Sequence, residues 1–338
     1  MRESRREELA LESNHFSEQA AYAHLDGAHE HALAASDRAI KAHERLLRAR
    51  RDDREVVEVL ASRYRDRADI RRELGRWMAG RSGHEEAVAQ YRAGIVDGER
   101  AIALYRESGA GEGGVYPLWV PSVQLLLGEL HAWTGDADAA REEADRAMPV
   151  YRAVPIEQEQ SALDLAHALS RYADVLERTG ARDEALAACR ESVAIYRRHL
   201  EPQGRLWQNR LSQGTAWVST PTWQRWCETA VDLARRLESE GLDAAPEALL
   251  TLQDAAEGFA GLVPDHMFNR LLPGVQDQVA RMDRVVGVME AWLIEIGQND
   301  LADQYRRTST TLVNYGGGRD WPAVLRQLRP ALEAALAR

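Results

Sequence analysis

The chain has 338 residues, of which 43 are Lys or Arg and 54 are Asp or Glu, and its formal net charge at pH 7 is −11. This acidity disfavours nucleic acid and anionic membranes as main partners, because both carry negative charge. Two Cys cannot build a disulfide framework, and no apolar run approaches the roughly 18–20 residues of a membrane span. We therefore expect a soluble, cytoplasmic protein.

Lysine is nearly absent from the sequence. Lys41 is the single lysine, and it lies in Ala39-Ile40-Lys41-Ala42 rather than after a Gly-rich loop. P-loop NTPases and protein kinases each need a lysine in a defined motif, so both classes are excluded. No Cys-rich zinc spacing exists either, and we expect neither a cofactor nor a metal ion.

Helix-forming residues dominate every segment, and no stretch alternates polar and apolar residues for long enough to form a strand. The sequence predicts an all-α fold of about 12–15 helices. Proline is favoured in the first turn of a helix. Helix starts are accordingly expected near Pro117, Pro155, Pro221, Pro246 and Pro322.

A short pattern recurs along the chain. A Gly is followed by an acidic residue about three positions later, by a small residue near plus five, and by small or apolar residues near plus nine and plus twelve. Two copies lie 45 residues apart, at Gly135 and Gly180. The copies begin, in chain order, at Gly27, Gly83, Gly135, Gly180 and, in degenerate form, Gly297.

The residue types of each copy suit the end of one helix and the start of the next. Gly tolerates the left-handed turn that ends a helix, and an acidic residue suits the positive end of the next helix. The small residues then allow two helices to approach closely. The copy at Gly83 is longer before its Tyr by nearly two helical turns, so its second helix should be longer and keep the same buried face.

Between the first two copies, Asp52-Asp53-Arg54-Glu55 resembles the start of an acidic magnesium motif of the terpene-cyclase kind. The fifth position is Val56 instead of an acid, so the acids are interpreted as a helix start. A run of arginines follows, which is either an anion-binding stripe or a solvated helix face. Acids three and four positions away favour the solvated face. The run consists of Arg63, Arg65, Arg67, Arg71, Arg72, Arg76 and Arg81.

Histidines are densest at His24, His29 and His31. His29 and His31 are two residues apart, so on a helix they point in different directions and do not converge on a metal ion. We predict no metal site.

The repeats resemble the tetratricopeptide repeat (TPR) family, in its long-helix bacterial form. The match consists of Leu127-Gly128, Gly135-Asp136, Ala140 and Ala147 in one copy, and of Tyr172-Ala173, Gly180 and Ala185-Leu186 in the next. The resemblance implies a right-handed α-solenoid over 1–200, with about four repeats, whose concave face binds a protein or peptide segment.

In that family the first helix of each repeat lines the concave face. The resemblance therefore implies a groove that is mixed in charge and takes residues from three copies. They are Asn14, Ser17, Ala21, His24 and Leu25; Ser122, Leu125, Glu129, Ala132 and Trp133; and His167, Ser170, Asp174, Glu177 and Arg178.

The repeats end at Glu201-Pro202, where a Trp-rich connector over 201–230 begins, and a helical region over 231–338, with degenerate repeats, follows. The tryptophans either plug the end of the solenoid or form a second, aromatic site of Trp217, Trp223 and Trp226. Cys189 is expected in the core, whereas Cys227 lies near a helix start, which could activate its thiol.

The leading hypothesis is a non-enzymatic bacterial scaffold or regulatory module that binds a protein or peptide. The alternative is a helical enzyme or small-molecule binder with a cleft between the repeats and the C-terminal region, using Trp217, Trp223, Trp226, Asp174 or Cys227. The sequence leaves open whether the chain forms a homodimer.

Overall fold

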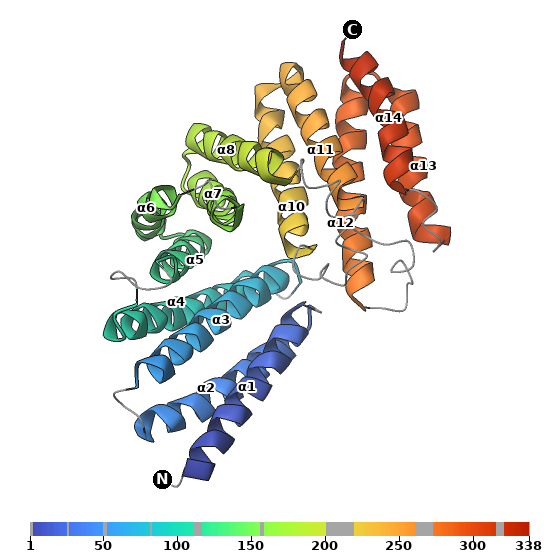
Figure 1. The fold of residues 1–338 in the computed structure, drawn as a ribbon. Helices are drawn as coiled ribbons and strands as arrows, with labels where there is room; N and C mark the ends of the chain where they lie inside the picture. Colours follow the sequence, from blue (N-terminus) through green and yellow to red (C-terminus); the bar gives the residue numbers. More distant parts are fainter. Residues whose placement is uncertain are drawn as a thin grey trace. The chain divides into compact units, whose positions relative to one another are not determined.

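The computed structural model describes residues 3–25, 27–49, 53–81, 83–110, 117–155, 159–200, 220–260, 273–315 and 321–337. Regular structure in these ranges is helical throughout, with thirteen α-helices and no strand, so the all-α prediction is confirmed (Figure 1). The contacts divide the chain into two compact units. Unit 1 comprises Met1–Val154 and Arg171–Ala185, and unit 2 comprises Pro155–Ser170 and Leu186–Arg338.

The first eight helices cover the predicted repeats and form four helix–turn–helix hairpins. Their bounds are α1 Glu3–Leu25, α2 His29–Ala49, α3 Arg54–Ala79, α4 His84–Glu107, α5 Trp119–Thr134, α6 Ala137–Ala153, α7 Glu159–Arg178 and α8 Arg182–Leu200. From α1 to α6, each helix packs against the next one in the chain. The unit division falls within α7 and α8, so the last hairpin contributes to both units.

Four of the five glycines of the repeat pattern end helices as predicted, whereas Gly83, with a φ of 118°, directly precedes α4 and the C-cap of α3 is Gly80. Gly135 and Gly180 have φ values of 83° and 88°. The residue after each glycine donates its N–H to a carbonyl five positions back, over 3.0 Å for Asp136 and 2.8 Å for Ala181. This arrangement is a Schellman turn, which needs the left-handed conformation that glycine adopts without strain. Gly27 and Gly297 form the same pair of hydrogen bonds.

The small residues of the pattern are buried where the second helix meets its neighbours. The plus-five alanines Ala32, Ala140 and Ala185 are at most 1% exposed, and Ala302 of the degenerate copy is also buried. The second copy begins its helix one residue earlier, so the corresponding alanine is Ala87. As expected, α4 is long, with 24 residues against 17 in α6 and 19 in α8.

Close approach between helices depends on absent side chains as well as on small ones. A Cβ atom on Gly128 of α5 would lie 3.0 Å from the carbonyl oxygen of Ala140 in α6. The Gly128 match to the repeat therefore marks a true helix–helix contact.

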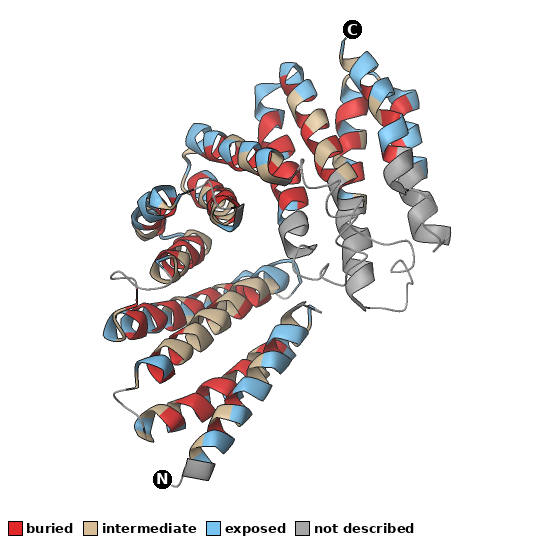
Figure 2. Cartoon of the chain, in the orientation of Figure 1, coloured by how far each residue is buried: buried red, intermediate tan, exposed pale blue. Residues whose placement is uncertain are grey.

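Unit 2 contains α10 Thr220–Leu237, the short 3₁₀ helices η3 Glu238–Glu240 and η4 Leu242–Ala244, α11 Ala245–Ala260, α12 Pro273–Glu295, α13 Asn299–Tyr315 and α14 Trp321–Leu336. Helix α10 packs on α11 and α12, and α14 packs on α11 and α13. Buried and exposed residues both occur along the coloured parts of these helices (Figure 2). Pro221, Pro246 and Pro322 are the second residues of α10, α11 and α14, which confirms these predicted starts.

The long helices do not have the character of membrane spans. Among the described residues, none is both long enough and apolar enough to cross a bilayer.

Candidate functional site

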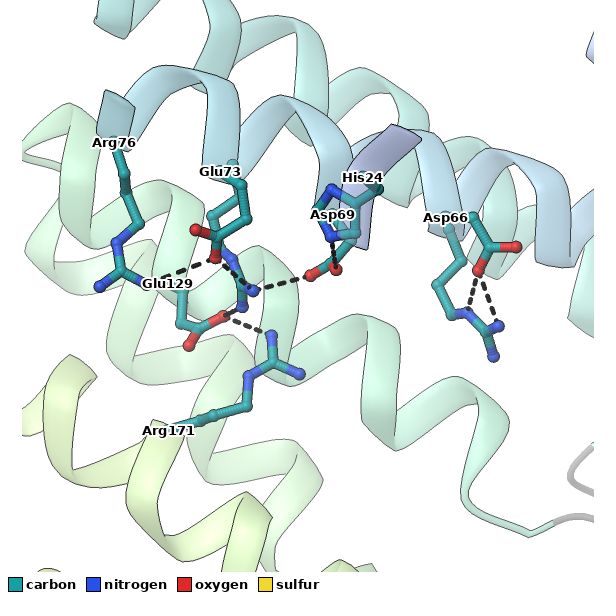
Figure 3. A network of polar contacts seen from close by, with 9 residues as sticks. His24, Asp66, Asp69, Glu73, Arg76, Glu129 and Arg171 are labelled. Carbon is teal, nitrogen blue, oxygen red and sulfur yellow. Dashed lines mark hydrogen bonds and ion pairs between the residues drawn. The ribbon is translucent and has the colours of Figure 1, made fainter. Parts of the chain in front are cut away.

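Charged side chains from the first helix of successive hairpins form one connected row in unit 1. His24 of α1 lies 3.6 Å from Asp69 of α3, measured from Nε2 to Oδ2. Arg72 of α3 binds Asp69 over 2.9 Å and Glu129 of α5 over 2.7 Å. Arg171 of α7 also donates to Glu129 (Figure 3). We call His24, Asp69, Arg72, Glu129 and Arg171 the charged row.

Burial makes the centre of the charged row energetically demanding. The side chains of Arg72, Glu129 and Arg171 are 14%, 9% and 15% exposed. Burial opposes ionisation of Glu129, but the guanidinium groups of Arg171 and Arg72 outweigh it, so the pKa of this carboxyl lies below its usual value. Removing one partner would leave a charge buried without compensation.

Glu73 and Arg76 extend the row along α3. Glu73 accepts from Arg72 over 2.8 Å and from Arg76 over 3.3 Å (Figure 3). Arg76 is more than half exposed, so the row grades from buried to solvated towards the end of α3.

Helix α3 is not the solvated helix that the arginine run suggested. No residue from 62 to 75 is exposed. Arg67 pairs with Asp97 of α4 over 2.5 Å and with Asp37 of α2 over 2.7 Å. The interpretation as a solvated face is therefore wrong over this stretch, because most of these arginines pair with acids from other helices.

The groove positions implied for α1 face α3. Arg63 donates to Asn14 over 2.9 Å and also to Ser17. The resemblance implied these two residues and His24 for one face of α1, and all three contact α3. Ala21, a further position of that set, is exposed.

Trp133 of α5, the predicted aromatic anchor, is held on its ring faces by two neighbours. Its ring stacks on Tyr91 of α4, with centroids 5.4 Å apart and planes at 27°. The guanidinium carbon of Arg178 lies 3.3 Å from the Trp133 centroid, a cation–π contact. Leu125 was expected in the groove but is fully buried in the core, so that prediction is wrong.

The remaining positions implied for α7 fall in two units. Asp174 and Glu177 belong to unit 1, as Arg178 does. His167 and Ser170 belong to unit 2, where the hydroxyl of Ser170 accepts a hydrogen bond from Thr229 over 3.1 Å. The structure thus joins Glu129, Trp133 and Arg178 in one unit, and His167 and Ser170 lie in the other.

The structure describes the predicted aromatic site only in part. Trp217 lies outside the described residues, and Trp223 lies in α10 without a described side chain. Trp226 is fully buried and stacks on Tyr196, with ring centroids 6.5 Å apart. Cys189 is buried as expected, and Cys227 is also buried, with its thiol donating to the carbonyl of Ala255 over 3.6 Å.

Metal-ligating side chains do not converge in the described ranges. No group of three or more His, Cys, Asp or Glu there could hold a metal ion. Asp53 instead caps α3, accepting a hydrogen bond from the Val56 N–H, which confirms its interpretation as a helix start.

Sequence reasoning missed the contribution of α3 and α4 to this face. The groove was mapped onto three copies, and the longer second copy was left out. Asp69, Glu73 and Arg76 recur at helical spacing, like the groove positions of the other copies, and that recurrence was the available signal.

Comparisons with known proteins bear on the fold. No protein-family model matches the chain, and no curated protein matches its sequence. Among solved structures, the chain is similar to the crystal structure of BtubC (BKLC) from P. vanneervenii, with a TM-score of 0.50 and 13% identity, covering 84% of this chain and 91% of that one. At this identity the likeness shows a shared helical fold alone.

Proposed function

We propose that the chain is a non-enzymatic scaffold or regulatory module, built as a TPR-like α-solenoid, that binds a protein or peptide segment along the first-helix face of unit 1. It acts in the bacterial cytoplasm and uses no cofactor. Nucleic acid and membrane are not its main partners.

The charged row carries this proposal. Four successive hairpins each contribute a first-helix side chain to the row, through His24, Asp69 and Arg72, Glu129, and Arg171. Side chains aligned across successive hairpins give an extended partner a continuous set of polar contacts. The common Schellman turns and buried alanines support the repeat architecture on which the row depends.

The internal ion pairs fit a recognition surface better than a catalytic one. The buried cations and acids of the row form ion pairs with one another, so a partner gains by matching their pattern rather than by neutralising a single charge. Charged contacts of this kind contribute mainly to specificity, while Tyr, Trp and Arg commonly supply the affinity of protein interfaces. Trp133 and Arg178 lie on this face.

Site-specific photo-crosslinking tests the proposal. A benzophenone amino acid replaces Ala21, an exposed position on the first-helix face, in cells that naturally express the chain. The matched control carries it at Val96, which is 63% exposed on α4, a second helix. We expect a discrete crosslinked band from position 21, identified by mass spectrometry, and none from position 96.

Two results would overturn the proposal: equal crosslinking from both positions, or none from position 21 while the chain is folded and abundant. A crosslink to a second copy of the chain would identify the partner as a homodimer through the same face.

A further inference from the structure

Tyr91 crosses from its own helix towards the first-helix face of unit 1. It belongs to α4, yet its ring packs over Gly75 of α3 and stacks on Trp133 of α5. A Cβ atom on Gly75 would lie 2.8 Å from Cζ of Tyr91, which is closer than real contacts allow. The missing side chain at Gly75 therefore opens the path that the phenol ring occupies.

The hydroxyl of Tyr91 is a hydrogen-bond donor without an acceptor. The residue is 1% exposed, and within the described part of the chain its hydroxyl has no hydrogen-bond partner. Burial raises the pKa of Tyr91, so the group stays protonated at neutral pH. A buried unpaired hydroxyl costs free energy, and natural proteins retain few of them without a reason.

Arg178 contacts the same Trp133 ring as Tyr91. Its guanidinium stacks on Trp133, and the carboxylates that attract it are those of Asp174 and Glu177. The pKa of Arg178 is lowered by partial burial of the guanidinium, and the like charge of Arg76 adds to that effect while Asp174 opposes it. An anion placed here would relieve both the burial and the repulsion.

We propose that Tyr91 and Arg178 hold the carboxylate of an Asp or Glu side chain of a peptide bound along the charged row. The inference rests on the proposed function and deepens it, since it names the chemistry of the partner at one position. Tyr91 donates its O–H, Arg178 donates N–H groups, and Arg76 supplies a second positive charge. A pair of donors without an acceptor fits a carboxylate and rejects an amine.

Direct hydrogen bonds, rather than net charge, must provide the affinity. Glu73, Asp174 and Glu177 also face this cluster, and the whole chain has a net charge of −11. Long-range electrostatics therefore repel an acidic peptide, which makes its binding a stringent readout of the local site.

The test titrates the full-length chain with a blocked peptide of alternating Glu and Gly, and with a matched peptide of alternating Gln and Gly. The nitrogen-15 resonance of the Trp133 indole, assigned with Trp133→Phe, reports binding beside the site. We expect a saturable shift with the Glu peptide and at least tenfold weaker binding of the Gln peptide. Each of Arg178→Gln and Tyr91→Phe should weaken Glu-peptide binding about tenfold, as expected for a hydrogen bond to a charged group.

Stability separates this role from a structural one. Because the Tyr91 hydroxyl is unpaired in the free protein, Tyr91→Phe should leave the melting temperature unchanged or raise it while binding weakens. Arg92→Gln removes the same charge from an exposed position on α4 and should alter neither property.

The carboxylate site is overturned if both peptides shift the indole equally or not at all, or if Arg178→Gln and Tyr91→Phe bind the Glu peptide as the natural chain does. Should the position-21 crosslink persist in that case, peptide binding stands and only the acidic specificity is lost. Should that crosslink also be absent, the proposed function fails as well.

Discussion

Each of the two units contains a carboxylate that is bound by two arginines, and these bridges differ in how far they are buried. In each, one carboxylate is bound by two guanidinium groups from other helices, and that carboxylate is nearly buried, at 9% exposed for Glu129 and 10% for Asp254. In unit 1 the arginines are about 15% exposed, and in unit 2 both are 33% exposed. Glu129 is bound by Arg72 and Arg171, and Asp254 by Arg197 and Arg329.

Exposure of the cations decides what each bridge contributes. The guanidinium groups of unit 2 keep more of their hydration than those of unit 1, so we expect their ion pairs to give less net stability and to cost less when broken. The guanidinium groups of unit 1 have given up more water, so their pairs add little over an apolar core but cost much to break. We therefore expect the buried ion pairs to favour one arrangement of the first helices of unit 1.

Replacing the central carboxylate of each bridge should give the largest difference in stability loss between the two units. We expect Glu129→Ala to destabilise unit 1 by about 3–5 kcal/mol, because it leaves Arg171 buried without its carboxylate and removes one of the carboxylates bound by Arg72, and Asp254→Ala to cost unit 2 about 1 kcal/mol. Urea titration with hydrogen exchange read in α3 and in α11 separates the units, which need not unfold together. Equal losses would show that exposure of the arginines does not set the cost.

A triple replacement controls for lost packing at Glu129. Arg72→Met, Glu129→Leu and Arg171→Met together remove every charge of the bridge and keep its approximate volume. The triple variant leaves neither arginine charge buried, so it should recover part of the stability lost in Glu129→Ala. Recovery is not complete because Asp69 loses Arg72 and, among the residues described, keeps only His24 as an ion-pair partner. A triple variant as unstable as Glu129→Ala would assign the loss to packing.

Glycine substitutions test whether unit 1 is also more tightly packed. Gly75→Ala should destabilise by about 1–2 kcal/mol, because overpacking against the Tyr91 ring exceeds the gain in helix propensity. Gly287→Ala on α12 of unit 2, where a Cβ atom would meet nothing within 4 Å, should stabilise by about 1 kcal/mol. Melting temperatures of the two variants check the signs, and a stabilising Gly75→Ala would contradict the tight contact.

Much of the backbone could be predicted from the sequence, because the signals are local. The glycines at 27, 135, 180 and 297 end helices by rules that involve a few neighbouring residues. The inward alanines follow from helical periodicity. The side of α1 that carries Asn14 and His24 follows from the resemblance to the repeat family.

The partners of the arginines could not be predicted, because they come from distant parts of the sequence. Arg72 has acids nearby at Asp69 and Glu73, which suggested a solvated surface, but it also binds Glu129, 57 positions later. Nothing local to Gly75 marks the ring of Tyr91 that fills its space. Such pairings become visible only when the hairpins are placed beside one another.

Raising the salt concentration should change the cost of breaking the two bridges by different, smaller amounts. Exposed pairs are screened at high ionic strength and buried pairs much less, so raising NaCl from 0.1 to 1 M, where the screening length falls from about 10 Å to about 3 Å, should erase most of the cost of Asp254→Ala. The cost of Glu129→Ala should persist. Urea midpoints of both variants at the two salt concentrations measure the difference, and parallel behaviour would contradict it.

The end of the charged row should give the smallest effect, and it depends on pH. The hydrogen bond to Asp69 raises the pKa of His24 against the effect of burial, with Glu73 adding to the rise and Arg72 opposing it. A raised folded-state pKa means that His24 stabilises the fold below its unfolded value of about 6.5, and that this stability is lost as pH rises through the folded-state value. His24→Gln should therefore lower the melting temperature more at pH 5.5 than at pH 8.5.

The pKa of His29, on the neighbouring helix α2, is shifted in the opposite direction. Burial lowers its pKa, and the charge of His24, whose ring centroid lies 5.8 Å away, lowers it further, with Glu73 opposing. A neutral His29 is therefore favoured in the fold, and its stabilising contribution is lost as pH falls through its folded-state pKa. His29→Gln should raise the melting temperature at pH 5.5 relative to the natural chain and leave it unchanged at pH 8.5. If both variants change the melting temperature at pH 5.5 in the same direction, the two histidines do not titrate in opposite senses. In that case the charged row ends at Asp69 rather than at His24.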